Sequence, residues 1–327
     1  MSKPLVVLFA DGGEVGVGLG HIFRLYPVFR YLCAMGVPAE MLVPLGEELL
    51  AQLGLEGVKS APPDPEAIVA ALCRPATAVA VLDTYRHRQP LYGLLGERGC
   101  RLAIFDDHFC VKQKVALIVN SSPVVSADDY GANVASRFLL GPAYASVSEG
   151  FAESRSRYVV SNDISSILVA LGGTDARGNL VALLGSLLPL LRTPVEICVL
   201  SASPVSMDTP DHVKLTWAWL DQGSLAQSMP DFDLAILAGG TMMLQTACVG
   251  IPTISWPQTP GQQAHVAAWE SKGAVIAIKG LDGLAAAVSR LQSSRLRLQL
   301  SRSGRSLVDG LGAGRIASCL CSMLEAE

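Results

Sequence analysis

Apolar runs of strand length alternate with segments of helix length from one end of the chain to the other. Runs that are apolar at consecutive positions are typical of strands covered on both faces, as in parallel sheets built from alternating strands and helices. The pattern therefore predicts an α/β fold, with strands at 5–10, 39–43, 78–82, 101–105, 116–119, 166–171, 195–200, 213–217 and 234–237.

The alternation is interrupted between Gly141 and Asn162, where small, polar and charged residues replace the apolar runs. A chain of 327 residues is about twice the usual domain size. We therefore expect two domains, residues 1–150 and 151–327, joined in this segment. The last stretch, Arg295–Glu327, has helical apolar spacing interrupted by a glycine-rich turn, which predicts two closing helices.

Composition narrows the class of partner and the compartment. Apolar residues make up 50% and the net charge is -4, which argues against disorder and against a nucleic-acid partner. The apolar N-terminal run lacks a cleavage site, and glycine and proline break the uncharged stretch Leu234–Trp269, so neither a signal peptide nor a membrane span is expected. The eight cysteines form no CxxC pair, which favours buried thiols in a cytoplasmic protein and implies no metal.

Three glycine-rich turns each follow a predicted strand and lead into a helix: Asp11–His21, Leu171–Asp175 and Ala238–Gln245. Glycine lets a ligand approach the backbone, and the N–H groups at the next helix N-terminus favour an anion. We expect a phosphorylated ligand, with a diphosphate held in the second half by Gly172, Gly173, Thr174, Gly239, Gly240 and Thr241. Ordinary strand-to-helix turns are the alternative. The spacing of Gly16, Gly18 and Gly20 departs from G-x-G-x-x-G, which disfavours a dinucleotide.

Nine short motifs occur in order along the chain: Gly18–Arg24, Asp83–Tyr85, Asp106–Asp107, Asn120, Leu140–Tyr144, Leu171–Asp175, Ala238–Thr241, Gly250–Pro252 and Asp309–Arg315. Together they resemble the UDP-sugar hydrolases of the pseudaminic acid pathway and the related spore-coat polysaccharide proteins, which look like MurG-type glycosyltransferases. The resemblance implies a GT-B fold of two Rossmann-like domains facing across a cleft, with a closing helix that crosses back. It also implies that water removes UDP from a 2,4-diacetamido-2,4,6-trideoxy sugar nucleotide without metal or cofactor.

The chain departs from the family pattern at Ala10 and at Val147–Ser148, where the family has arginine, and at Gln245, where it has glutamate. An amide still bonds to a hydroxyl, so Gln245 is expected at the ribose. The resemblance places Trp219 and Leu220 near the uracil and Gln263 beside the nucleotide, although the sequence around Gln263 equally fits an ordinary helix start.

His21 ends the first glycine turn at the start of a helix, where the helix dipole disfavours imidazolium and keeps the ring able to accept a proton. By resemblance His21 is the catalytic base; a helix cap or a phosphate donor is the alternative. Asp11 ends the first strand and is expected to orient His21 or to bind the sugar, unless it caps a loop.

Further polar residues end neighbouring strands and are expected to line the sugar pocket, together with Gly18, Gly20 and Arg24 of the first motif. Adjacent carboxylates at a strand end point to opposite sides. Of Asp106 and Asp107, we therefore expect one to face the site and the other to bind backbone N–H groups. The alternatives are an ordinary turn residue for Asn120 and linker packing for Tyr144. The residues are Asp83, Tyr85, Asp106, Asp107, Asn120 and Tyr144.

Two other functions fit the same residues. A glycosyltransferase has the same fold and nucleotide but moves the sugar to an acceptor. A binding protein without catalysis is favoured by the departures at Ala10, Ser148 and Gln245.

Overall fold

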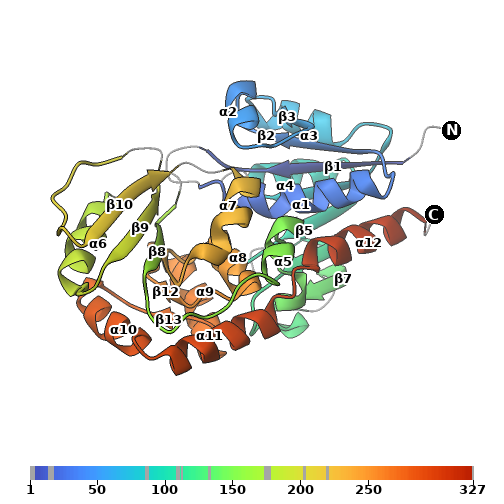
Figure 1. The fold of residues 1–327 in the computed structure, drawn as a ribbon. Coiled ribbons are helices and arrows are strands. Elements are labelled where there is room, and N and C mark those ends of the chain that lie inside the picture. The colour runs from blue at the N-terminus through green and yellow to red at the C-terminus, as the bar shows by residue number, and fades with distance from the viewer. Residues whose placement is uncertain are drawn as a thin grey trace. The chain divides into compact units, whose positions relative to one another are not determined.

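The computed structural model describes residues 4–13, 18–84, 88–107, 111, 113–131, 134–172, 178–201, 204–218 and 221–325. The chain divides into two compact units (Figure 1): an N-terminal unit, Met1–Ser148 with Gly310–Glu327, and a C-terminal unit, Glu149–Asp309. The division lies next to the expected boundary at residue 150. The last helix, however, belongs to the N-terminal unit and not to the expected domain 151–327.

The N-terminal unit contains a seven-stranded sheet in the order β3-β2-β1-β4-β5-β6-β7, in which all neighbouring strands are parallel. Its strands are β1 (Leu5–Ala10), β2 (Ala39–Val43), β3 (Val58–Ser60), β4 (Thr77–Asp83), β5 (Leu102–Phe105), β6 (Val115–Asn120) and β7 (Ala135–Leu140). Its helices are α1 (Gly20–Ala34), α2 (Glu47–Gln52), α3 (Pro65–Leu72), α4 (Arg88–Glu97) and α12 (Gly312–Glu325), with short 3-10 turns η1 (Ala127–Tyr130) and η2 (Pro142–Tyr144).

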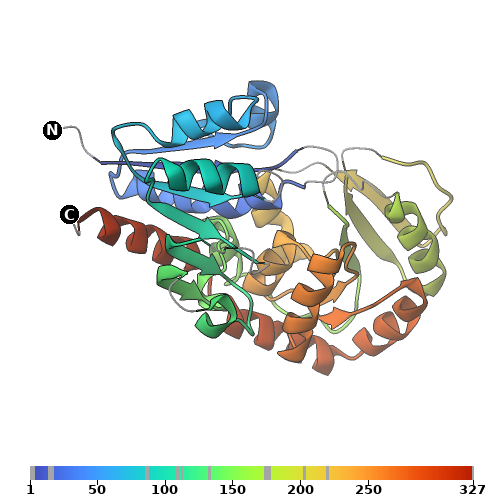
Figure 2. The same ribbon diagram turned by 180° about the vertical axis from the view of Figure 1, so that it is seen from behind.

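Helices cover both faces of this sheet, which is why its central strands are apolar at consecutive positions. Val6 and Leu8 of β1 pack in the core formed with α1 and α12, while Val7 and Phe9 pack in the core formed with α3 and α4. Figure 1 shows α1 and α12 together, and the view from behind in Figure 2 shows helices over the opposite face. Successive side chains of each strand therefore enter two different layers.

The C-terminal unit contains a six-stranded parallel sheet in the order β10-β9-β8-β11-β12-β13. Counted from its first strand this is the order 3-2-1-4-5-6 of the Rossmann fold. Its strands are β8 (Ser166–Ala170), β9 (Val195–Leu200), β10 (Val213–Ala218), β11 (Leu234–Leu237), β12 (Thr253–Ser255) and β13 (Ile276–Ala277). Its helices are α5 (Glu149–Ser154), α6 (Asn179–Leu187), α7 (Gln222–Ser228), α8 (Thr241–Val249), α9 (Pro260–Ser271), α10 (Leu284–Leu291) and α11 (Ser294–Leu307), with 3-10 turns η3 (Leu188–Leu190), η4 (Met229–Asp231) and η5 (Leu281–Gly283).

The α/β class and all nine expected strands are confirmed, with ends that differ by one residue at most. The four strands that the pattern did not reveal are β3, β7, β12 and β13. Three of them have two or three residues, too few to form an apolar run, and β7 is an edge strand whose residues are only partly buried. Length and edge position explain these misses.

The two closing helices are α11 and α12, and residues Val308–Leu311 lie between them. The stretch Ser294–Glu325 contains a window with mean hydropathy 1.3, which by length and composition alone is enough for a membrane span. This is weak evidence, because core helices pass the same test and 44% of the window is buried.

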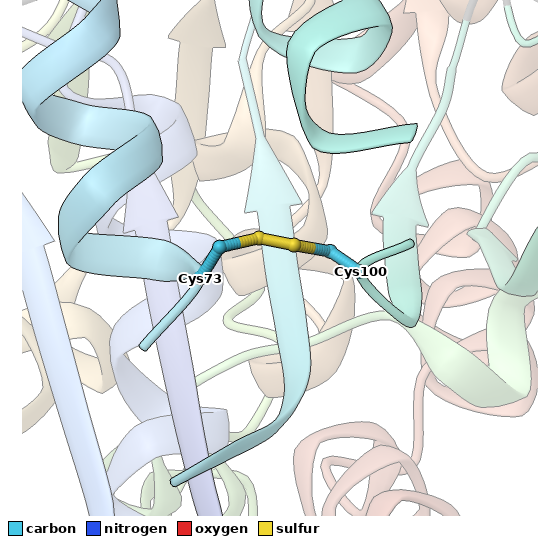
Figure 3. The surroundings of a disulfide bond; sticks show 2 residues. All are labelled: Cys73 and Cys100. Atoms are coloured by element: carbon cyan, nitrogen blue, oxygen red, sulfur yellow. A yellow bond between two sulfur atoms is a disulfide. The ribbon is translucent and has the colours of Figure 1, made fainter. Parts of the chain in front are cut away.

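The sequence pattern predicts buried thiols, but two of the eight cysteines form a disulfide. Cys73 follows α3 and Cys100 precedes β5, and their Cα atoms are 6.2 Å apart (Figure 3). The pair is separated by 27 positions in the sequence, so its spacing gave no local motif. The expectation of buried thiols is therefore wrong for this pair, and both residues are half-buried.

A buried arginine connects two segments of the C-terminal unit by hydrogen bonds. The guanidinium of Arg297 in α11 is fully buried and donates to the carbonyl oxygens of Leu291 at 2.5 Å, Ser161 at 2.8 Å and Asn162 at 2.6 Å. These bonds tie the segment that enters β8 to the end of α10. Among the residues that the structure describes no carboxylate pairs with this cation, and its burial is tolerated because carbonyl dipoles surround it.

We predict that Arg297→Met lowers the free energy of unfolding of the C-terminal unit by about 2–4 kcal/mol, because buried carbonyl groups lose their donor. All four tryptophans lie between residues 217 and 269, so urea unfolding followed by tryptophan fluorescence reports on this unit. Arg302→Met, at an exposed position of the same helix, is the control and should change stability by less than about 0.5 kcal/mol. Equal losses in both variants would contradict this role.

Candidate active site

Four ionisable side chains meet at the carboxyl end of the N-terminal sheet. His21 Nδ1 lies 2.7 Å from Asp83 Oδ1. Arg24 grips the same carboxylate, since its Nε donates to Oδ2 at 2.7 Å and its Nη2 donates to Oδ1 at 2.8 Å. Arg24 Nη1 donates to Asp107. The cluster formed by His21, Arg24, Asp83 and Asp107 is called the histidine cluster below.

Strand and helix periodicity bring these residues together. Val79 and Val81 of β4 point into the core shared with α1, so Asp83, two residues further, points to the same side. His21 and Arg24 are three residues apart in the first turns of α1 and therefore share one helix face. Each of the two then reaches the same carboxylate.

The electrostatics of the cluster hold Asp83 ionised. Its burial, at 1% exposure, acts to raise the pKa of the carboxyl group. The charges of Arg24 and His21 and their hydrogen bonds outweigh burial, so the pKa of Asp83 lies well below its usual range. Burial likewise acts to lower the pKa of Arg24, but Asp107 and Asp83 raise it above its ordinary value.

This arrangement selects one tautomer of the His21 ring. An ionised Asp83 only accepts hydrogen bonds, so Nδ1 carries the proton and Nε2 keeps its lone pair. Arg24 Nη2 also lies 3.5 Å from Nδ1, which is too long for a strong hydrogen bond, so the 2.7 Å contact with Asp83 decides the assignment. The His21 side chain is 18% exposed, which leaves part of the ring open to solvent or ligand.

Asp107 and Phe105 complete the surroundings of the guanidinium. The Arg24 guanidinium carbon lies 5.5 Å from the centre of the Phe105 ring, within the range of a cation–π contact. The Asp107 side chain is 22% exposed, against 1% for Asp83. Arg24 is thus shielded on the side of the sheet and remains closest to solvent near Asp107.

Asp11, expected beside His21, lies on the other layer of the same sheet edge. Alternation from Val7 and Phe9 places Asp11 on the side of α3 and α4, and its carboxylate accepts a hydrogen bond from Thr84. Asp11 is 3% exposed. The carboxylate in contact with the His21 ring is therefore Asp83, which the sequence analysis had placed among sugar ligands.

Asp106 and Asn120 also lie on the α3 and α4 side. Asp106 accepts a hydrogen bond from the Val111 backbone N–H at 2.9 Å, the role expected for one of the two adjacent aspartates. The Asn120 amide donates to the Asp106 carbonyl at 2.8 Å and to the Tyr130 hydroxyl at 2.9 Å. Both side chains are about 1% exposed, and these contacts stabilise the loops that follow β5 and β6.

The remaining residues expected at the sugar have other surroundings. Tyr144 lies in η2 and packs against the core of α1 and α12, the linker packing that was the alternative for this residue. Gly18 is exposed before α1, and Gly20 is the first residue of that helix. Tyr85 lies outside the described residues.

In the C-terminal unit, two glycine turns lie at the carboxyl end of the sheet. Gly172 follows β8 with φ +113°, a conformation that favours glycine, and a Cβ there would meet none of the described residues within 4 Å. Gly239 follows β11 against α9, where a Cβ would lie 2.4 Å from Val266 Cγ2. Gly240 is the N-cap of α8, and Thr241 is the first residue of that helix. Gly173 and Thr174 lie outside the described residues.

The amide side chains of Asn179 and Gln258, which the sequence did not point to, border these turns together with that of Gln262, which by resemblance forms a pair with Gln263 beside the nucleotide. Asn179 Nδ2 donates to Gln258 Oε1 at 2.5 Å, and the Gln258 backbone N–H donates to Gln262 Oε1 at 2.7 Å. A Cβ on Gly240 would lie 3.9 Å from Gln262 Nε2, so this network reaches the start of α8. The signal in the sequence was the position of Asn179 at the start of a helix after a glycine turn.

The other nucleotide candidates are placed as follows. Gln245 is 2% exposed and its Nε2 donates to Gln222 Oε1 at 2.7 Å, so its amide contributes to the packing of α7 against α8. Gln263 is exposed in the first turn of α9, which Thr259 caps by accepting the Gln262 N–H at 3.2 Å. Trp219 and Leu220 lie outside the described residues.

Solved structures of other proteins share the fold of this chain. The chain is similar to MurG of Acinetobacter baumannii with a TM-score of 0.68 and 13% identity, covering 98% of this chain and 100% of that one. TcCGT1 in complex with UDP gives a TM-score of 0.67 with 12% identity, covering 99% and 100%. The spinosyn rhamnosyltransferase SpnG gives 0.64 with 14% identity, covering 96% and 99%. At these identities the comparison shows the fold alone, which is that of GT-B glycosyltransferases.

One relative is similar in sequence as well. The spore coat polysaccharide biosynthesis protein SpsG of Bacillus subtilis (strain 168) is 31% identical over 204 residues, 58% of this chain and 60% of that protein. The chain thus spans less than two thirds of the length of this relative. The resemblance to the spore-coat polysaccharide proteins inferred from the nine motifs is confirmed. No protein-family model matches the chain.

We predict that Asp83→Asn lowers the free energy of unfolding by about 3–5 kcal/mol near neutral pH, because Arg24 stays buried without its main counter-ion. The pKa of Asp83 is depressed in the folded chain, so its contribution is full above the ordinary carboxyl pKa and is lost as the pH falls. The difference from the unmutated chain should therefore narrow below about pH 4. Urea unfolding followed by circular dichroism at a series of pH values measures it.

Asp128→Asn is the matched control, since Asp128 is exposed in η1. It should change stability by less than about 0.5 kcal/mol at every pH. A difference for Asp83→Asn that stays constant down to the acid limit would show that the carboxylate is not held ionised by Arg24.

Proposed function

We propose that the chain hydrolyses a UDP-linked sugar of the 2,4-diacetamido-2,4,6-trideoxy type at its anomeric carbon, with His21 as the base. The observation that carries the proposal is the 2.7 Å contact between His21 Nδ1 and Asp83, whose carboxylate Arg24 keeps ionised. Such a pair fixes the ring tautomer and stabilises the imidazolium that forms when Nε2 takes a proton.

The reaction balances without a further reactant. Water attacks the anomeric carbon as His21 Nε2 takes one of its protons, and the bond from that carbon to the diphosphate oxygen breaks. UDP leaves with the electron pair, and the water oxygen becomes the anomeric hydroxyl of the free sugar. Asp83 stays ionised throughout, because Arg24 compensates its charge.

The glycine turns of the C-terminal unit support a nucleoside diphosphate as the leaving group. Backbone N–H groups at the start of α8, next to Gly239 and Gly240, are suited to phosphate oxygens, and no described residue lies within 4 Å of where a Cβ of Gly172 would be. TcCGT1 was solved with UDP and SpnG with thymidine diphosphate, which supports the same class of ligand here. Stabilisation of the departing diphosphate by these dipoles would lower the barrier.

Transfer of the sugar to an acceptor is the second candidate, because solved structures of this fold include glycosyltransferases. The two functions share the nucleotide and differ in the attacking group. Incubation with a nucleotide sugar and no acceptor distinguishes the two functions. A hydrolase releases free sugar and UDP at equal and constant rates, whereas a transferase releases both only slowly.

We predict that His21→Ala lowers the rate of UDP release by about a hundredfold to ten-thousandfold, as expected for loss of a general base. The UDP affinity, measured by calorimetry, should stay within about threefold. His21→Gln retains a hydrogen-bond donor for Asp83 but no basic nitrogen, and should be equally slow. His212→Ala is the control, because the His212 ring contacts the Leu191 carbonyl in the C-terminal unit. Normal turnover by His21→Gln would exclude the proposed base.

Gly240→Ala tests the nucleotide part separately. The φ of Gly240 is -100°, which alanine tolerates, and a Cβ there lies 3.9 Å from its nearest neighbour. The new methyl group should leave stability nearly unchanged but weaken UDP binding by about tenfold, because it covers the N–H groups at the start of α8. Gly185→Ala, at an open position within α6, should bind UDP normally. Equal affinities in both variants would place the nucleotide elsewhere.

A further inference from the structure

The proton that His21 takes up in the proposed reaction brings two positive charges together. His21 Nδ1 lies 3.5 Å from Arg24 Nη2, and both nitrogens contact the same oxygen of Asp83, Oδ1, at 2.7 Å and 2.8 Å. The guanidinium does not repel a neutral imidazole, but it repels an imidazolium. Arg24 and Asp83 are 7% and 1% exposed, so water screens this repulsion poorly. One carboxylate is therefore too few for two cations at this place.

Asp107 supplies a second carboxylate to the same guanidinium. Phe105 of β5 packs in the core with α1, and Asp107, two residues further, lies on the same side of the sheet. Its carboxylate accepts a hydrogen bond from Arg24 Nη1, whereas Asp83 accepts from Nε and Nη2. Burial acts to lower the pKa of Arg24, and of the groups that raise it the charge of Asp107 has the largest effect. Asp107 is therefore a full counter-ion of Arg24.

The charge of the histidine cluster depends on Asp107 in both states of the ring. With a neutral His21, the two carboxylates and Arg24 leave the cluster with one net negative charge. An imidazolium at His21 makes the cluster neutral. Without the carboxylate of Asp107, the same step would lead from a neutral cluster to one net positive charge, which is unfavourable at buried groups. Asp107 thus favours the imidazolium that forms as water attacks.

We propose that Asp107 is a positioning residue that acts through Arg24: its charge balances the guanidinium and so allows the His21 ring to become an imidazolium beside it. The inference rests on the proposed function, in which His21 Nε2 takes a proton from water. Asp107 itself stays ionised, and no covalent bond to it forms or breaks. A charge that acts through Arg24 needs no contact with the substrate, which distinguishes this role from the sugar contact expected from the sequence.

Asp107→Asn retains an acceptor oxygen for Arg24 but removes the charge, so it tests the charge directly. With a UDP-sugar that the unmutated chain hydrolyses, we expect kcat to fall by about tenfold and KM to stay within about twofold. The loss is moderate because Asp107 is 22% exposed and solvent screens part of its charge. Asp107→Glu restores the charge and should keep kcat within about threefold of the unmutated value. A raised KM with an unchanged kcat would overturn the proposal, because Asp107 would then bind the sugar.

A second pair of variants separates a charge that acts through Arg24 from one that acts alone. Arg24→Gln removes the cation that Asp107 balances. Adding Asp107→Asn to Arg24→Gln should therefore change kcat by less than about twofold, against about tenfold in the unmutated background. Asp128→Asn, at an exposed position of η1, is the control and should leave kcat unchanged in both backgrounds. Equal losses from Asp107→Asn in both backgrounds would overturn the proposal.

Nitrogen chemical shifts of the His21 ring give a measurement that needs no turnover. At about pH 6 they report the share of rings that carry a proton on both nitrogens. This share should be severalfold lower in Asp107→Asn than in the unmutated chain, and Asp107→Glu should restore it. Equal shares would overturn the proposal even if the double variant failed to fold. If the shares differ but the unmutated chain releases no UDP, the proposed function fails and the electrostatic role of Asp107 stands.

Discussion

A guanidinium buried between two carboxylates is the interaction on which the rest of the N-terminal site depends. Arg24 would be unfavourable so deep in the unit without Asp83 and Asp107, and Asp83 would not stay ionised there without Arg24. The ionised Asp83 in turn requires a donor at His21 Nδ1. A buried ion pair therefore determines which nitrogen of a partly exposed ring carries the proton.

Strand alternation decides which polar residues join that ion pair. At each strand end one side chain points to α1 and the next points to α3 and α4. Asp83 and Asp107 fall on the first side with His21, whereas Asp11 and Asp106 fall on the second, where they bind Thr84 and a backbone N–H. One sheet edge thus carries the histidine cluster on one side and, on the other side, polar residues that stabilise its loops.

Much of the fold could be predicted from the sequence, because the central strands are buried on both faces and read as apolar runs. The placement of Asp83 and Asp107 at one sheet edge was also predictable, but their pairing with Arg24 was not, because it depends on the face that each strand end presents to α1. The alternation was visible in β4, where Val79, Val81 and Asp83 share a side. The disulfide could not be predicted from the sequence, because its cysteines are 27 positions apart and meet only after β4 and α4 have folded between them.

The tautomer of His21 tests the account most directly. The nitrogen chemical shifts of its ring, measured by NMR at a pH where the ring is uncharged, distinguish a proton on Nδ1 from one on Nε2. We expect the proton on Nδ1, with an unprotonated Nε2, and a mixture of both forms once Asp83 is replaced by alanine. A proton on Nε2 in the unmutated chain would contradict the account, because no base would then be available to activate water.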